Sequence, residues 1–173
     1  MKKLLFLSFS IVLSAFMLTS CNHSSNTDNQ SDNKIIPQGY VDLGLPSGTL
    51  WKAVNESGGD GYYTYNEAVS QFGGQLPTKE QWEELKDYCE WTWREPQGGY
   101  KVTGPNGKFI VLPAAGLRTC GGDVYGVGSI GYYWSSTPDG SDNAWFLNFT
   151  SSSVDMNYNY RCSGFSVRLV QNK

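Results

Sequence analysis

The residues best suited to contact another molecule lie together near the C-terminal end of the sequence. Between residues 139 and 163, short polar side chains are interspersed with aromatic ones. Tyrosine offers a large, stiff contact area at low entropic cost, and serine and asparagine form adjustable hydrogen bonds, a mixture typical of antibody paratopes. We therefore expect a ligand-binding face composed of Asp139, Ser141, Asp142, Asn143, Trp145, Asn148, Ser151, Ser153, Asp155, Asn157, Tyr158, Asn159, Tyr160 and Ser163.

A second interpretation of the same stretch needs no ligand. In it, these residues are ordinary hydrophilic loop residues, and Tyr158 and Tyr160 are half buried on a strand. Any single residue of the stretch fits this interpretation, whereas the cluster as a whole favours recognition.

Few residues are suited to catalysis. His23 is the only histidine and lies in a polar N-terminal segment, so we expect no histidine-based triad or metal site in the folded region. Acid–base glycoside hydrolysis needs an apolar pocket that raises the pKa of one carboxyl group. No such pocket is indicated around the four candidate carboxylates, which are Asp123, Asp139, Asp142 and Asp155. We expect no enzymatic activity, no metal ion and no cofactor.

The N-terminus indicates the compartment. Lys2 and Lys3 precede an uncharged apolar run over residues 4–18, which is too short and wrongly flanked for a stable membrane span. Leu18-Thr19-Ser20-Cys21 then resembles a bacterial lipobox. The resemblance implies cleavage before Cys21 and lipid on its sulfur and new amine, and two or three acyl chains form a durable membrane anchor. An ordinary secretory signal with a chance cysteine would instead leave a soluble periplasmic protein.

The sequence divides into three parts. Residues 1–20 form the expected lipoprotein signal peptide. Residues 21–34 form a flexible tether, because residues 22–34 include no aliphatic or aromatic side chain that could offset the entropy of ordering. The tether has no dense acidic run after Cys21, so an outer-membrane lipoprotein facing the periplasm and one displayed on the cell surface both remain open. Residues 35–173 are long enough for one domain that buries roughly two-thirds of its unfolded surface.

The charge argues against nucleic acid as a partner. The formal charge is −3, and removal of residues 1–20 takes away two lysines and no acidic residue, which makes it −5. No basic stripe is present that would release counterions from a phosphate backbone.

Three cysteines fall within the expected domain, namely Cys89, Cys120 and Cys162. In an oxidising compartment, an odd number allows at most one disulfide bond within the domain. Cys120 could pair with either of the others, and the sequence leaves this choice open.

Local signals predict the elements that must position these residues. Short strands are expected at residues 40–43 and 49–51. Thr64 with Glu67, and Thr78 with Gln81, are capping boxes that predict helices ending near residues 72 and 89. In the second helix, Trp82, Leu85 and Cys89 recur at the spacing of one buried face.

The second half of the chain is predicted to be β. Strands at residues 100–103 and 108–112 flank a Gly-Pro-Asn-Gly turn, and further strands are expected at residues 132–135, 144–149 and 165–170. We also expect Arg118 and Arg168 to be buried or half-buried ion-pairing residues. Early helices and late antiparallel strands indicate an α+β fold, with two short helices packed on small twisted antiparallel sheets.

Seven blocks of the sequence resemble a known family in their order. They are YVDLGLPSGTLW, YTYNEAV, LPTKEQWEEL, LPAAGLR, GYYWSSTP, NAWFLNF and GFSVRLV, and they cover nearly all of residues 40–170. This order resembles the Fibrobacter succinogenes major paralogous domain, common in lipoproteins of gut Bacteroidetes. That family is related to formylglycine-generating enzymes and to variable proteins of diversity-generating retroelements. The resemblance implies a C-type-lectin-like fold whose late strands and loops present a ligand-binding face.

The sequence departs from the family pattern at two places. Gly74-Gln75 stands where relatives usually have Trp-Arg, which removes a packing aromatic residue. Lys52-Ala53-Val54 replaces a more usual Ala-Thr-Cys, which removes a possible disulfide partner.

The resemblance to formylglycine-generating enzymes is incomplete at the catalytic cysteines. In YNYRCSGF, Cys162 matches the second active cysteine, but Asn157 occupies the position of the first. Copper binding in that chemistry needs both thiolates, so oxidase activity is not expected.

In the retroelement proteins, mutation of adenines in asparagine codons produces serine, aspartate, tyrosine and cysteine, a pattern that residues 139–163 resemble. The protein sequence alone leaves open whether this stretch is diversified.

The sequence thus predicts a lipid-anchored envelope protein that binds an external protein or glycan through residues 139–163. A structural or adhesive envelope component that uses the same domain for assembly is the alternative, and a formylglycine-generating-enzyme-like oxidase comes third.

Overall fold

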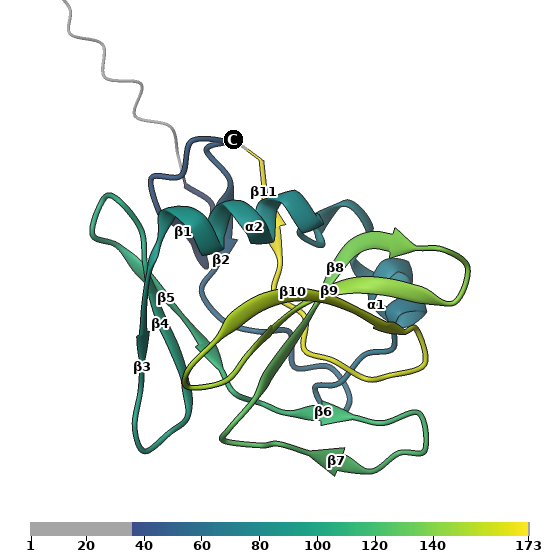
Figure 1. Cartoon of the computed structure of the whole chain (residues 1–173). Helices are drawn as coiled ribbons and strands as arrows, with labels where there is room; N and C mark the ends of the chain where they lie inside the picture. Colours follow the sequence, from purple (N-terminus) through teal and green to yellow (C-terminus); the bar gives the residue numbers. More distant parts are fainter. Residues whose placement is uncertain (1–35, 173) are drawn as a thin grey trace, which may run out of the picture. The chain divides into compact units, whose positions relative to one another are not determined.

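The computed structural model describes residues 36–172, in a mixed α+β arrangement (Figure 1). This part of the chain contains two short α-helices and four small antiparallel sheets, which confirms the predicted α+β class. The expected signal peptide, Cys21 and the tether lie outside the described residues. Neither helix within residues 36–172 has the length and apolar character needed to cross a membrane.

Both predicted helices form where their capping boxes place them. Thr64 caps α1 (Tyr65–Phe72), and Thr78 caps α2 (Lys79–Tyr88), each through reciprocal bonds with the side chain three residues on. Helix α1 ends at Gly73, whose φ of 45° suits glycine, and a 3₁₀ turn, η1 (Gly73–Gln75), follows. Trp82 and Leu85 of α2 are fully buried.

The strands form three three-stranded sheets and one two-stranded sheet among the described residues. The first sheet has the order β1 (Tyr40–Asp42), β2 (Leu50–Lys52) and β11 (Val170–Gln171). The second has the order β3 (Glu90–Trp93), β4 (Gly99–Thr103) and β5 (Phe109–Pro113). The third has the order β10 (Val154–Tyr160), β9 (Asn143–Phe149) and β8 (Gly131–Asp139), and β6 (Leu117–Arg118) pairs with β7 (Val124–Tyr125).

The predicted strand at residues 165–170 is wrong for most of its length. Only its last residue belongs to a strand, β11, while Phe165 and Ser166 form isolated bridges to Tyr63 and Tyr133. The segment is buried, but its backbone bonds go to several different neighbours in turn, including the backbone N–H groups of Lys52 and Glu56. It therefore connects sheets instead of extending one.

Two hydrophobic cores lie on opposite faces of the β8–β9 pair. Consecutive residues of a strand point to opposite faces, and Tyr133 belongs to the core with Trp51 and Trp82. Trp134 belongs to the other core, where its ring stacks on Phe165 at a centroid distance of 4.2 Å. Helix α2 packs against β8, β9 and β10 and contributes Trp82 to the first core. The third sheet is thus fixed from both sides.

A fully buried arginine joins the sheets. The Arg168 guanidinium donates to Asn55 Oδ1 at 2.9 Å, Lys52 O at 2.8 Å and Val111 O at 2.6 Å. Lys52 is the last residue of β2, Asn55 follows it, and Val111 lies in β5. One side chain therefore links the first and second sheets. Burial lowers the pKa of Arg168, and the nearby Tyr133 hydroxyl opposes this shift. The expected burial is confirmed, but the bonded acceptors are carbonyl and amide oxygens instead of a carboxylate.

Replacement Arg168→Lys should lower the free energy of unfolding by about 3–5 kcal/mol, because an ammonium cannot satisfy the three fixed acceptors of the guanidinium fork. Urea denaturation measures the loss. The matched control is Arg94→Lys, an exposed arginine, with an expected change below about 0.5 kcal/mol. Equal stability of the two variants would contradict a structural role for Arg168.

Cys120 and Cys162 form a disulfide bond with Cα atoms 5.1 Å apart, and Cys89 is free. This resolves the choice that the sequence left open. The bond links the turn between β6 and β7 to the segment after β10, across a sequence separation of 42 residues. Burial raises the pKa of the Cys89 thiol to about 11, and Glu84 adds to the shift.

Removal of this bond in a Cys120→Ser, Cys162→Ser variant should destabilise the fold by about 4 kcal/mol, the chain-entropy value for a loop of this length. Thermal unfolding under non-reducing conditions measures the change. Cys89→Ser serves as the control, because it removes a thiol without opening a loop. A reducing agent should lower the melting temperature of the native chain but not that of the double variant. An equal response of the two chains would show that the bond does not form in solution.

Candidate functional site

Most of the predicted ligand-binding residues lie on the hairpin of β9 and β10 and in the turns at its ends. Strand β10 is the edge of its sheet and pairs only with β9 over seven residues. Part of the predicted polar stretch thus forms a regular strand, β10. Its pairing register decides which side chains share a surface.

Four of the predicted residues share one face at the open end of the hairpin. Trp145 lies opposite Tyr158, and Asn143 lies opposite Tyr160. The Trp145 and Tyr158 rings meet edge to face at a centroid distance of 5.7 Å. The side chains of Tyr158 and Tyr160 are 54% and 64% exposed. We call Asn143, Trp145, Tyr158 and Tyr160 the aromatic face.

The aromatic face lies beside the N-terminal end of helix α2, just beyond the part of the sheet that the helix covers. Farther along the same side, Leu147 and Phe149 are buried in the first core, and Val154 and Met156 pack against it. Lys79, the first residue of α2, places its ammonium 3.8 Å from the centre of the Trp145 ring. This cation–π contact, together with the bond from Lys79 N–H to Thr137 Oγ1 at 3.0 Å, fixes the helix end beside the face.

A hollow of about 330 Å³ adjoins the aromatic face. Its lining consists of Asn66, Ser141, Asp142, Tyr160, Arg161 and Cys162. Arg161 holds the turn between β8 and β9, because its Nε donates to Asn143 O at 3.0 Å and its Nη2 to Gly140 O at 2.8 Å. The guanidinium also lies 5.0 Å from the Tyr65 ring. Predicted residues Ser141 and Asp142 are therefore presented next to Tyr160 on a braced turn.

The remaining predicted residues do not join this surface. Asp155, Asn157 and Asn159 alternate with the tyrosines and so project from the opposite face of β10, as does their neighbour Asn148 on β9. Ser151 and Ser153 lie at the other end of the hairpin, roughly 20 Å away at about 3.3 Å per strand residue. Ser163 is buried beside the disulfide bond. Asp139 is the exception, because it ends β8 opposite Asn143 and so lies on the side of the aromatic face.

Two residues of the site escaped sequence reasoning. Lys79 is distant in sequence from the hairpin, so the sequence placed it only in a helix. In the structure the start of α2 lies close to β8 and β9 (Figure 1). Arg161 sits within the predicted stretch, but nothing in the sequence marked its bonds to the turn. Only tertiary packing brings these two cations to the aromatic residues.

An oxidase or a metal-dependent enzyme would need free thiols or metal ligands at its active site. The Cys162 sulfur is bonded to Cys120, so it is not a thiol in this structure. Within residues 36–172, no group of three or more histidine, cysteine, aspartate or glutamate side chains is arranged to hold a metal ion.

Asparagine side chains occupy backbone donors of the edge strand. The Tyr158 N–H donates to Asn157 Oδ1 at 2.8 Å, and the Tyr160 N–H donates to Asn159 Oδ1 at 2.7 Å. Because the two tyrosines alternate along the strand, their N–H groups point the same way. An edge strand with unpaired donors is a template for another strand, and these bonds reduce that tendency. We therefore expect a partner to contact β10 mainly through side chains.

Replacement of Asn157 and Asn159 by alanine should speed hydrogen exchange of the Tyr158 and Tyr160 amides about fivefold, since each loses a bond of about 1 kcal/mol. NMR-detected exchange measures both amides directly. Aspartate at the same two positions is the matched control, because its carboxylate oxygen can still accept the bond. Equal exchange in the alanine and aspartate variants would show that the asparagine oxygens do not hold these donors.

Comparison with known proteins gives one partial match. Residues 104–170, which include every predicted ligand-binding residue, match a family model described as a domain of unknown function (DUF8237). No curated protein and no solved structure matches. The match covers less than half of the 173 residues, so it shows similarity over the third sheet and its surroundings and carries no functional description.

Proposed function

We propose that this chain is a ligand-binding protein of the bacterial cell envelope, and that the aromatic face with the adjoining Ser141–Asp142 turn contacts an external protein or glycan. The observation that carries the proposal is the exposure of two tyrosines beside Trp145 on a hairpin braced by Lys79 and Arg161. Exposed apolar surface that is rimmed by polar residues marks sites of interaction with other molecules.

The chemistry of this surface suits recognition. Tyrosine and tryptophan dominate binding hot spots because each buries a large apolar area and keeps a polar group for hydrogen bonding. Asn143, Ser141 and Asp142 supply hydrogen-bonding groups around the rings. Ordering costs on binding are small, because β9 is held between two cores and the turn is tied to Arg161.

The fold and the anchor belong to the same proposal. Strands β1 and β11, from the two ends of the described chain, both pair with β2, which supports a C-type-lectin-like scaffold closed by its terminal strands. Late strands of that scaffold then carry the binding face. Lipid attached at Cys21 anchors the chain in the envelope, in the outer membrane, and residues 21–34 connect the anchor to the domain.

Replacement of Tyr158 and Tyr160 by alanine in the full-length chain should reduce retention of its ligand by about 30-fold or more, equivalent to the roughly 2 kcal/mol of a hot-spot pair. A glycan array and pull-downs from envelope and host extracts supply the ligand. Tyr88→Ala with Tyr125→Ala is the matched control, because it removes two exposed tyrosines elsewhere on the domain. Thermal unfolding is expected to change little in both double variants.

Two results would contradict the proposal. Unchanged ligand retention in the Tyr158 and Tyr160 variant would place recognition elsewhere on the protein. Loss of the folded state in that variant alone would assign the two rings to packing, as expected for a structural or adhesive component.

A further inference from the structure

A separate polar cavity lies on a part of the domain that the proposed function does not use. It has a volume of about 430 Å³ and is lined by the segment 58–63, by α1 and by β6. Its side chains come from Asp60, Tyr62, Tyr63, Glu67, Gln71 and Arg118. None of the predicted ligand-binding residues is among them, and the volume falls within the usual range of small-molecule sites.

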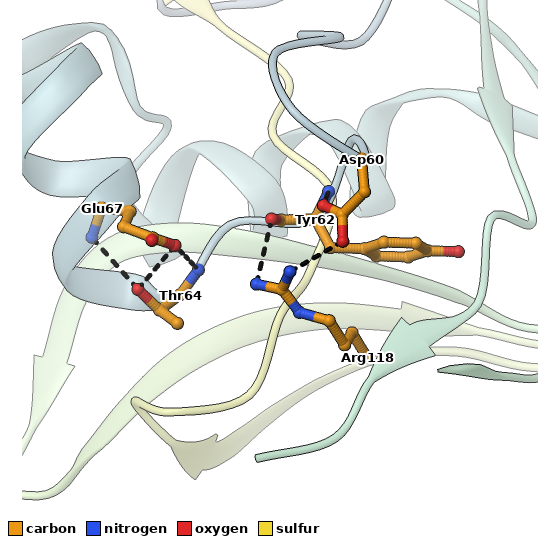
Figure 2. A network of polar contacts seen from close by, with 5 residues as sticks. All are labelled: Asp60, Tyr62, Thr64, Glu67 and Arg118. Carbon is orange, nitrogen blue, oxygen red and sulfur yellow. Dashed lines mark hydrogen bonds and ion pairs between the residues drawn. The ribbon is translucent and has the colours of Figure 1, made fainter. Parts of the chain in front are cut away.

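Two of the lining residues, Asp60 and Arg118, form an ion pair, which Figure 2 shows. Asp60 Oδ2 accepts from Arg118 Nη1 at 2.7 Å, and Asp60 Oδ1 accepts from the Tyr62 N–H at 3.0 Å. The Arg118 Nη2 donates to Tyr62 O at 3.3 Å. The Tyr62 N–H and the Arg118 charge lower the pKa of Asp60, so its carboxylate is ionised at neutral pH. Both charged groups are held in place by backbone bonds.

Glu67 is fixed on the opposite side of the network that Figure 2 shows. Its Oε2 accepts from the Thr64 N–H at 2.8 Å and from the Thr64 hydroxyl at 2.9 Å. These bonds lower the pKa of Glu67. Its Oε1 has no bonded partner among residues 36–172 and remains an acceptor for another molecule.

A buried hydroxyl adds an unused donor. Tyr63 is only 5% exposed, and its oxygen accepts from the Gly58 N–H at 2.7 Å. No acceptor for its hydroxyl hydrogen exists in the described part of the chain. Because Tyr63 and Gly58 both line the cavity, the hydroxyl hydrogen is available to a ligand oxygen there.

The ligand must therefore both donate and accept hydrogen bonds. The Tyr63 hydroxyl and the spare N–H groups of Arg118 are donors, whereas Glu67 Oε1 and the Asp60 oxygens are acceptors. An ammonium group only donates and a carboxylate only accepts, but a hydroxyl does both. The three charged side chains sum to −1, which disfavours anions. We propose that this cavity binds a neutral sugar ring through its hydroxyl groups, independently of the aromatic face.

An adjoining cavity extends the site. It has a volume of about 400 Å³ and shares Gly59, Asp60 and Tyr62 with the first. The shared residues place the two cavities side by side.

Saturation-transfer NMR on the full-length chain, in a detergent without sugar groups, tests the proposal. The probes are the methyl glycosides of glucose, galactose, mannose and N-acetylglucosamine, with glucosamine and galacturonate as charged comparisons. At least one neutral glycoside should bind, and Tyr63→Phe should weaken it about tenfold, as expected for loss of one buried hydrogen bond. Tyr65→Phe is the matched control, because this buried hydroxyl donates to Ser136 O and does not line the cavity.

Further variants keep the test decisive if Tyr63→Phe fails to fold. Gln71→Ala changes an exposed lining residue, and Glu67→Gln preserves the capping box, as Gln81 does in α2. Both should weaken the neutral glycoside severalfold. The proposal is overturned if no neutral glycoside binds, if a charged probe binds better, or if these variants leave binding unchanged. Loss of sugar binding only in the Tyr158 and Tyr160 variant would also overturn it, and would support the proposed function.

Discussion

The buried guanidinium of Arg168 is the constraint on which the arrangement of the sheets depends. Desolvation of this cation is unfavourable unless it is hydrogen-bonded, and each of its three nitrogens donates to an oxygen: Asn55 Oδ1, Lys52 O and Val111 O. Asn55 extends the network, because its amide donates to the Tyr133 hydroxyl, which in turn donates to Pro113 O. One charge thereby fixes the first and second sheets and strand β8 at a single point. The hydrophobic cores then pack around this polar junction.

From this junction the positions of both candidate sites follow. Tyr133 and Trp134 anchor β8 in two cores, β9 pairs with β8, and β10 is carried as an edge with its tyrosines on the open end. The segment before Tyr63 is held by Arg118 of β6, and the turn that follows β6 is joined by the disulfide bond to the chain after β10. The two sites therefore share supports, although their side chains are separate sets.

The two helices and the β4–β5 hairpin were predicted correctly because their causes are local, and the strands expected at residues 132–135 and 144–149 also form, within β8 and β9. Capping boxes at Thr64 and Thr78 and the turn before Lys108 act within a few residues, so each could be read without a fold. The segment 165–170 was misassigned because burial makes it apolar, whatever its hydrogen-bonding partners are. Strand β10 was not among the predicted elements, because asparagine and aspartate have low strand propensity and its form comes from pairing with β9. Only the second interpretation placed Tyr158 and Tyr160 on a strand, and it expected them to be half buried, whereas both are exposed. Composition thus identified the residues of the site, but not which of them lie on the same face of β10. The contacts of Lys79 and Arg161 could not be predicted, because they depend on packing between segments that are far apart in the sequence or on the turn geometry.

The alternation of Tyr133 and Trp134 restricts where this chain can change in length. Insertion or deletion of one residue between 131 and 134 would exchange the side chains that enter the two cores, since a shift of one position turns every side chain of a strand to the other face. The irregular pairing between Trp134 and Pro138 and the turns at both ends of β9 carry no such restriction. Changes in chain length are therefore tolerated in the turns around the aromatic face, where they alter the shape of the surface, whereas residues 131–134 of β8 keep a fixed number.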